Sequence, residues 1–166
     1  MNHAAVVRAW LLTAFWISVI VLESFFGSSA HTSLFILPVL RFLFPGMSVP
    51  QLDLLHGIIR KIGHFVGYAT LSFLFYRAWW VTMRARISHT NLSWRAMFSV
   101  WIGRAAVLAL LGTLAIAGLD EWHQSFDPTR GPSVRDVALD ETGGILAQLV
   151  LVTISAASAT RLREET

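Results

Sequence analysis

The chain has 166 residues, of which 55% are hydrophobic and only 14% are charged, and its formal net charge is +3. Soluble globular domains carry about 25% charged residues, so the composition favours an integral membrane protein with a single domain over residues 1–166. Because cysteine is absent, disulfides, thiolate metal ligands and cysteine nucleophiles are excluded. The basic residues are scattered, so no nucleic-acid partner is expected.

The first apolar segment, residues 5–26, is long enough to cross a bilayer, which requires about 20 helical residues. A signal peptide is the alternative, since Ser28-Ser29-Ala30 resembles a cleavage site. The apolar run exceeds the usual core of about 7–15 residues, so a retained helix is favoured. Glu23, near its end, is expected at the membrane interface rather than in a polar site.

Residues 34–44 form an apolar stretch that is too short to span and contains Pro38. We expect this proline to break the segment, which favours a re-entrant or surface-lying piece between the first two spans. Ser48, with Gln51 three residues later, resembles a capping box and predicts that the next helix begins near Val49.

The second span, residues 58–80, opens with Arg60 and Lys61. Helical spacing places Lys61, His64 and Tyr68 on one face. Anchoring at the membrane interface explains Arg60 and Lys61 as well as a role in a polar site does. Anchoring does not explain His64, which lies one turn deeper. Gly63 and Gly67 form a small-xxx-small pattern, which predicts close packing on a neighbouring helix.

The third span, residues 97–119, is followed directly by a polar cluster. Asp120, His123 and Gln124 follow the spacing of one helix face, with Glu121 about a quarter-turn away. Carboxylates at a helix C-terminus oppose the helix dipole, which favours a functional role. The short loop that follows contains Arg130.

The fourth span, residues 137–159, is preceded by Ser133 and Asp136, which have the spacing of a helix cap. A cap does not explain Asp140, one turn deeper. Carboxylates within a membrane are costly unless paired, so we expect Asp140 to be paired with a basic group or protonated. The basic groups available are Arg60, Lys61, Arg130 and Arg135.

Counting arginines near the span ends predicts the orientation. One side receives the larger set, so both termini are expected in the cytoplasm and both polar clusters on the extracytoplasmic face. The expected fold is therefore all-α: a polytopic membrane protein with four transmembrane helices and one polar pocket. The arginines of the larger set are Arg8, Arg77, Arg84, Arg86, Arg95, Arg161 and Arg163.

The pattern Arg60-Lys61-x-x-His64-x-x-x-Tyr68, then Asp120-Glu121-x-x-Gln124, Pro128-x-Arg130, Asp136 and Gly143, resembles the VanZ-like family of small bacterial membrane proteins. The resemblance covers about half the chain, roughly residues 60–144, and implies a family core at about residues 58–150. Asp140 stands where the family pattern usually has Asn. The family is named after an accessory protein of glycopeptide resistance associated with teicoplanin tolerance, so the resemblance implies a multi-pass protein of the bacterial cell (inner) membrane. It does not supply a reaction.

Two main functions remain open. In the first, the pocket binds an anionic envelope lipid, a lipid-linked cell-wall precursor or a glycopeptide, and contributes to glycopeptide tolerance. In the second, the protein is an enzyme acting on a lipid-linked phosphate or carboxylate by acid–base catalysis. The catalytic candidates would be His64, Asp120, Glu121 and His123. The ligand-binding candidates are Arg60, Lys61, Tyr68, Gln124, Arg130, Asp136 and Asp140.

A metal site is a lesser alternative, since nitrogen and oxygen ligands suit zinc or manganese. It would be built from His64, Asp120, His123 and Asp136. No metalloprotease-type helical signature supports it, so no cofactor is expected. The sequence does not predict an oligomeric state.

Overall fold

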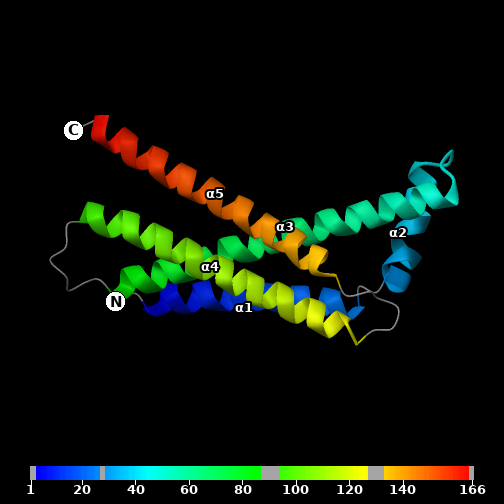
Figure 1. The fold of residues 1–166 in the computed structure, drawn as a ribbon, viewed down its shortest axis with the longest axis horizontal. Helices are drawn as coiled ribbons and strands as arrows, with labels where there is room; N and C mark the ends of the chain where they lie inside the picture. Colours follow the sequence, from blue (N-terminus) through cyan, green and yellow to red (C-terminus); the bar gives the residue numbers. More distant parts are fainter. Residues whose placement is uncertain (1–2, 27–28, 87–93, 127–132, 165–166) are drawn as a thin grey trace.

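The structure is a computed structural model that describes residues 3–26, 29–86, 94–126 and 133–164. Within these residues the chain is all-helical (Figure 1), as the sequence predicts. The helices are α1 (His3–Phe26), α2 (Ser29–Leu43), α3 (Val49–Arg86), α4 (Trp94–Gln124) and α5 (Val134–Glu164).

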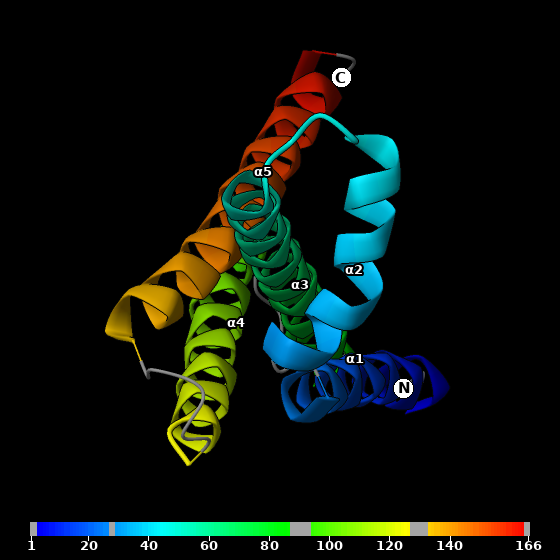
Figure 2. The same cartoon turned by 90° about the vertical axis from the view of Figure 1, so that its right-hand side faces the viewer.

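The long helix α3 is the centre of the fold, and the other four helices all pack against it (Figures 1 and 2). Tyr68, Leu71 and Ala78 of α3 are almost fully buried. On the facing side of α4, Ala105 and Ala109 are also fully buried. Such small side chains let two helix backbones approach closely.

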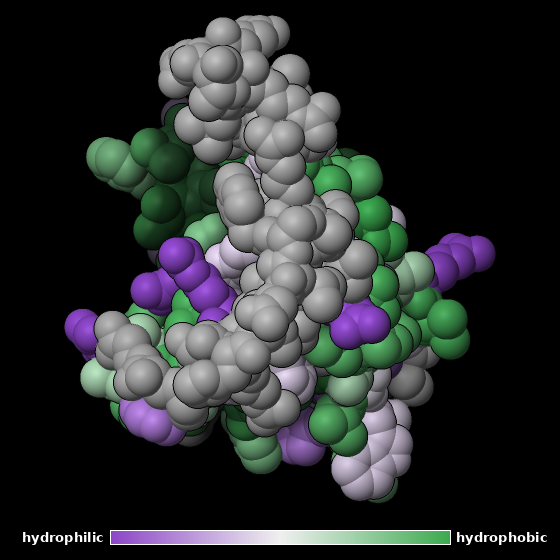
Figure 3. All heavy atoms as spheres, turned by 90° about the vertical axis from the view of Figure 1, so that its left-hand side faces the viewer, coloured by the Kyte–Doolittle hydropathy of each residue, from purple (hydrophilic) through white to green (hydrophobic). Residues whose placement is uncertain are grey.

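Three helices are long and apolar enough to cross a membrane, and they agree with the first, third and fourth predicted spans. Their outward faces carry exposed large hydrophobic side chains, as expected for contact with lipid. Figure 3 looks onto the end where α1 begins, and hydrophobic residues dominate the flanks that are not grey. The three spans are His3–Phe25, Ile102–Gln124 and Val134–Ser155.

Helix α2 corrects one expectation and the start of α3 confirms another. Pro38 lies inside α2, and the helix continues through it to Leu43, so the predicted break is wrong. A helix of 15 residues extends about 22 Å, less than the ~30 Å of a bilayer core. Helix α3 begins at Val49 as predicted, and the Ser48 backbone N–H donates to Gln51 Oε1 over 2.8 Å.

Side-chain hydrogen bonds tie the outer helices to α3. The indole Nε1 of Trp10 donates to Thr82 Oγ1 and that of Trp16 to the Gly67 carbonyl, both over 2.9 Å. From α5, Gln148 Nε2 donates to the Ser72 hydroxyl over 2.7 Å. Because apolar contact alone does not favour helix association in lipid, such bonds help to fix the packing.

The closest approach of α5 to α3 is at Gly143. A Cβ built there would lie 2.4 Å from the Phe65 carbonyl oxygen, so only glycine fits without displacing a backbone. Gly63 and Gly67 behave differently, because a Cβ at either would have nothing within 4 Å. The small-xxx-small prediction for that pair is therefore wrong, since neither position is a close helix contact.

Candidate functional site

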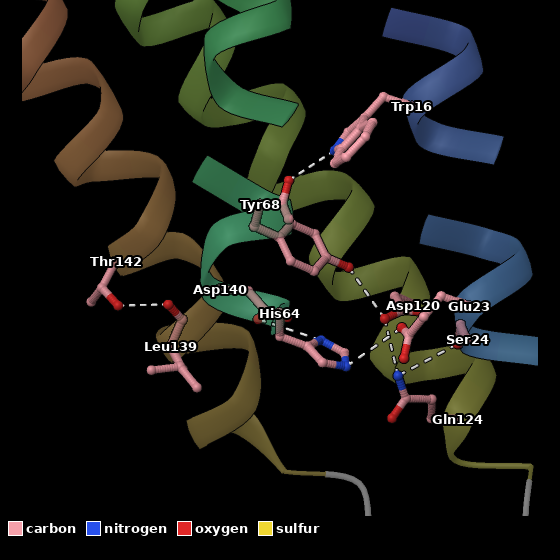
Figure 4. Close-up of polar contacts among 11 residues, drawn as sticks. Trp16, Glu23, Ser24, His64, Tyr68, Asp120, Gln124, Leu139, Asp140 and Thr142 are labelled. Carbon is pink, nitrogen blue, oxygen red and sulfur yellow. Dashed lines mark hydrogen bonds and ion pairs between the residues drawn. The ribbon is translucent and has the colours of Figure 1, made fainter. Parts of the chain in front are cut away.

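Polar side chains from four helices meet at one end of the bundle, where α1 and α4 end and α5 begins (Figure 1). They form two groups, which we name by their centres. The histidine group consists of Glu23, His64 and Asp140. The aspartate group consists of Ser24, Tyr68, Asp120 and Gln124. Figure 4 shows both.

In the histidine group, the imidazole of His64 lies between two carboxylates (Figure 4). Its Nδ1 is 3.6 Å from Asp140 Oδ1, and its Nε2 is 3.6 Å from Glu23 Oε2. These distances suit charge pairing but are longer than hydrogen bonds. Asp140 is buried, whereas the Glu23 side chain is 46% exposed. A histidine held in this way can exchange protons and can hold an anion when it is protonated.

Two expectations about this group change. Glu23 was expected at the membrane interface alone, but it faces His64 and is part of the site. Asp140 is paired with a basic group as predicted, and that group is His64, which was not among the basic partners considered from the sequence. His64 and Asp140 face each other because Gly143 brings α5 close to α3 one turn away.

The side chains of the aspartate group make shorter contacts with one another than those of the histidine group. Asp120 is 9% exposed, and its Oδ2 accepts hydrogen bonds from the Tyr68 hydroxyl at 3.2 Å and from Gln124 Nε2 at 3.0 Å. Gln124 also lies 3.5 Å from the hydroxyl of Ser24. The group thus joins α3, α4 and α1 through a carboxylate that is satisfied by neutral donors.

A small polar pocket of about 30 Å³ opens beside the histidine group. This volume holds about one water molecule. Glu121 lines the pocket and also accepts a hydrogen bond from the Ser133 backbone N–H, which ties the end of α4 to the start of α5. The lining residues are Arg60, Lys61, His64, Glu121, Gln124, Asp136, Leu139 and Asp140.

A larger groove of about 300 Å³ lies on the other side of His64, between α1, α2 and α3. Most of its lining is apolar, including Trp16, Ile36 and Ile59. Arg60 and His64 line both the groove and the polar pocket. The two cavities therefore meet at these two side chains.

Some predicted residues lie elsewhere. The ring of His123 packs on Phe25 of α1 with the centroids 4.2 Å apart, and His123 lines neither cavity. Tyr68 lines the groove rather than the polar pocket. Arg135 is exposed at the start of α5. Arg130 lies outside the described residues.

The proposed metal-ligand set is not assembled in the described part of the chain. His123 lies on Phe25, and Asp120 faces Tyr68 and Gln124. Among the residues described, no three His, Asp or Glu side chains are placed to hold a metal ion.

The apolar helices and the polar cluster between them define a multi-pass helical membrane protein. The chain belongs to the VanZ/LLP1 family, whose match covers residues 9–155. This range is longer than the stretch that carries the motif resemblance, and it includes α1, which supplies Glu23. No curated protein and no solved structure matches the chain significantly.

Proposed function

We propose that this protein binds an envelope lipid or glycopeptide through its anionic head group, in the bacterial cell (inner) membrane. The observation that carries the proposal is the position of Arg60 and His64, which line both a polar pocket and an apolar groove. A ligand held there would contact a cation and an apolar surface at once. Binding of a glycopeptide, or of the lipid-linked precursor that it recognises, would link the site to teicoplanin-type tolerance.

The charges around the polar pocket are compatible with an anion. Three carboxylates line it: Glu121 already accepts from Ser133, Asp140 faces His64, and Asp136 lies in the first turn of α5. Arg60 and Lys61 supply the positive charge at its edge. Arginine binds phosphates and carboxylates with two parallel hydrogen bonds. Arg130 is proposed as a further contact from the loop.

The proposed topology has four spans, with α3 as the fourth. Helix α3 is 38 residues long, or about 57 Å, and it lies between the other helices. It is not among the three helices that are apolar enough to span by composition alone, and this is expected because neighbouring helices rather than lipid cover much of it. Helix α2 would lie re-entrant or at the interface.

Both termini are proposed to be cytoplasmic. Helix α1 begins and α5 ends at the same end of the bundle (Figure 1), and most flanking arginines lie there. A reporter that is active only in the periplasm, fused after Thr166, should therefore be inactive. An active reporter would overturn this orientation and would place the site in the cytoplasm.

A second function is favoured by one observation, the placement of His64 between two carboxylates. In an enzyme, Asp140 would orient the imidazole through Nδ1. Nε2, on the side of Glu23 and the groove, would then exchange a proton with a lipid-linked phosphate or carboxylate. Glu121 and Asp120 would influence the imidazole through the charge of the surrounding site rather than by direct contact.

The test uses purified protein in nanodiscs of phosphatidylcholine, with lysophosphatidic acid as the anionic probe. Arg60→Gln should weaken binding roughly tenfold or more, because a hydrogen bond to a charged group contributes about 1.5–3 kcal/mol. The control is Arg135→Gln, which removes an exposed arginine of α5 that lines neither cavity.

The same samples separate binding from catalysis. Release of inorganic phosphate that disappears in His64→Gln, with binding retained, would favour the enzyme. No binding of lysophosphatidic acid or teicoplanin by the wild type would contradict the proposed binding function, as would equal binding by wild type and Arg60→Gln.

A further inference from the structure

We propose that the ligand of this site is a lipid with one hydrocarbon chain in the groove between α1, α2 and α3. The inference rests on the proposed function and names the ligand class: a membrane amphiphile that carries its anionic group at one end of an extended chain.

The sizes of the two cavities indicate where such a ligand would lie. The polar pocket holds about one water molecule, which is too little for a head group. The groove, at about 300 Å³, is at the lower end of the ~300–1,000 Å³ typical of small-molecule sites. Most of the ligand would therefore occupy the groove, with its anionic group where the two cavities meet.

The groove changes from polar to apolar along its length. At one end, Glu23 of α1 faces His64 of α3. Trp16, two turns before Glu23 on α1, donates its indole N–H to the carbonyl of Gly67, about one turn after His64 on α3. Because the two helices run in opposite directions, Glu23 and His64 share one end and Trp16 and Gly67 lie deeper. This order matches the order of head group and chain in a lipid.

The bilayer supplies the chain. The groove is bounded by α1, which is apolar enough to span, and by Ile36 of α2 and Ile59 of α3. A chain that moves from the bilayer into this groove leaves one apolar environment for another. The anionic group then provides the selectivity, through Arg60 and His64.

Two glycines make the groove. Gly63 and Gly67 line it one turn apart on α3, and a Cβ at either position would meet nothing within 4 Å. A larger side chain at these positions would occupy the space left for the ligand. Its Cβ would meet no neighbouring helix, unlike a Cβ at Gly143.

The experiment measures lysophosphatidic acid binding in phosphatidylcholine nanodiscs for Gly67→Leu and Gly63→Leu. The matched control is Gly57→Leu, on the same helix, also with open space around its Cβ and outside the groove. We expect about tenfold weaker binding for the groove variants, because a chain excluded from the groove can no longer hold its anionic group against Arg60 and His64, and the charge-assisted contact is lost. Gly57→Leu should bind like the wild type.

A second measurement uses the wild-type protein and so does not depend on the folding of a variant. Lysophosphatidic acid with a photoreactive diazirine near the end of its chain should label the groove segments of α1, α2 or α3, around Trp16 and Ile36. Labelling of the outer faces of α4 and α5 instead would overturn the inference.

The outcomes separate this inference from the function on which it rests. If both groove variants bind like Gly57→Leu while Arg60→Gln binds weakly, the head-group site stands and the chain inference is wrong. If the wild type binds teicoplanin but no anionic lipid, the chain inference is wrong and the proposed function stands. If it binds neither, both are wrong.

Discussion

The two polar groups of this protein lie side by side but are built differently. In the aspartate group, Asp120 is buried and accepts two hydrogen bonds of 3.0 and 3.2 Å from neutral donors. In the histidine group, His64 sits 3.6 Å from two carboxylates and borders both cavities. A satisfied buried network favours a single arrangement of its helices. A loosely paired histidine beside a cavity retains the capacity to bind or to exchange a proton.

The comparison assigns a structural role to the aspartate group and a ligand-binding role to the histidine group. It makes different predictions for stability and for binding, because each group has a residue that can be changed with little alteration of volume.

Gly143→Ala should have the largest effect. The new Cβ would lie 2.4 Å from the Phe65 carbonyl oxygen, so α5 must move away from α3 beside His64. Overpacking of this kind destabilises by about 1–3 kcal/mol or more. Thermal unfolding in detergent should show a clear loss of stability, and lysophosphatidic acid binding should weaken because Asp140 moves from His64. Gly67→Ala, in open space, is the control and should unfold like the wild type.

His64→Gln should weaken lysophosphatidic acid binding roughly tenfold, the effect of losing one charge-assisted contact, with little change in unfolding temperature. His64 makes no short hydrogen bond within the described residues whose loss would unfold the protein. A large loss of stability with unchanged ligand affinity would reverse the assignment of the two groups.

Tyr68→Phe should show the opposite pattern with a smaller magnitude. It removes the donor that holds Asp120 at 3.2 Å but keeps the aromatic ring. Hydrogen bonds between membrane helices contribute about 0.6 kcal/mol on average and up to about 1.7, so a modest loss of stability is expected by thermal unfolding. Binding should be unchanged, although Tyr68 lines the groove, because the ring remains. Weaker binding at unchanged stability would mean that the Tyr68 hydroxyl contacts the ligand.

Asp140→Asn should have the smallest effect on folding. Asn has nearly the same shape as Asp, and it removes a carboxylate that burial disfavours. The yield of folded protein by size-exclusion chromatography should equal or exceed that of the wild type. A large loss of folded protein would show that the charge on Asp140 is needed to hold α5 against α3.

The sequence predicted the parts of the fold that depend on local pattern. Apolar length identified three spans that the structure supports, and the spacing of Ser48 and Gln51 identified the start of α3. Pro38 was misinterpreted because a proline near the middle of a short helix does not always break it.

The site was harder to predict, because helical spacing does not show which face of a helix points inward. His123 and Gln124 follow Asp120 by three and four residues, but they have different partners. Gln124 donates a hydrogen bond to Asp120, while His123 packs on Phe25. Glu23 was assigned to the membrane interface rather than to the polar site, although an ionisable residue near the end of an apolar helix is itself a sign that it faces the bundle. Gly63 and Gly67 were read as a packing face, because sequence alone does not distinguish a close helix contact from an open groove.

The most direct test of the account is an experimental structure of the protein in a phosphatidylcholine nanodisc with lysophosphatidic acid bound. The account predicts the phosphate within hydrogen-bonding distance of Arg60 or His64, the acyl chain between α1, α2 and α3, and Asp120 still bonded to Tyr68 and Gln124. A phosphate bound at the aspartate group, or a lipid bound only on the outer surface of the helices, would contradict it.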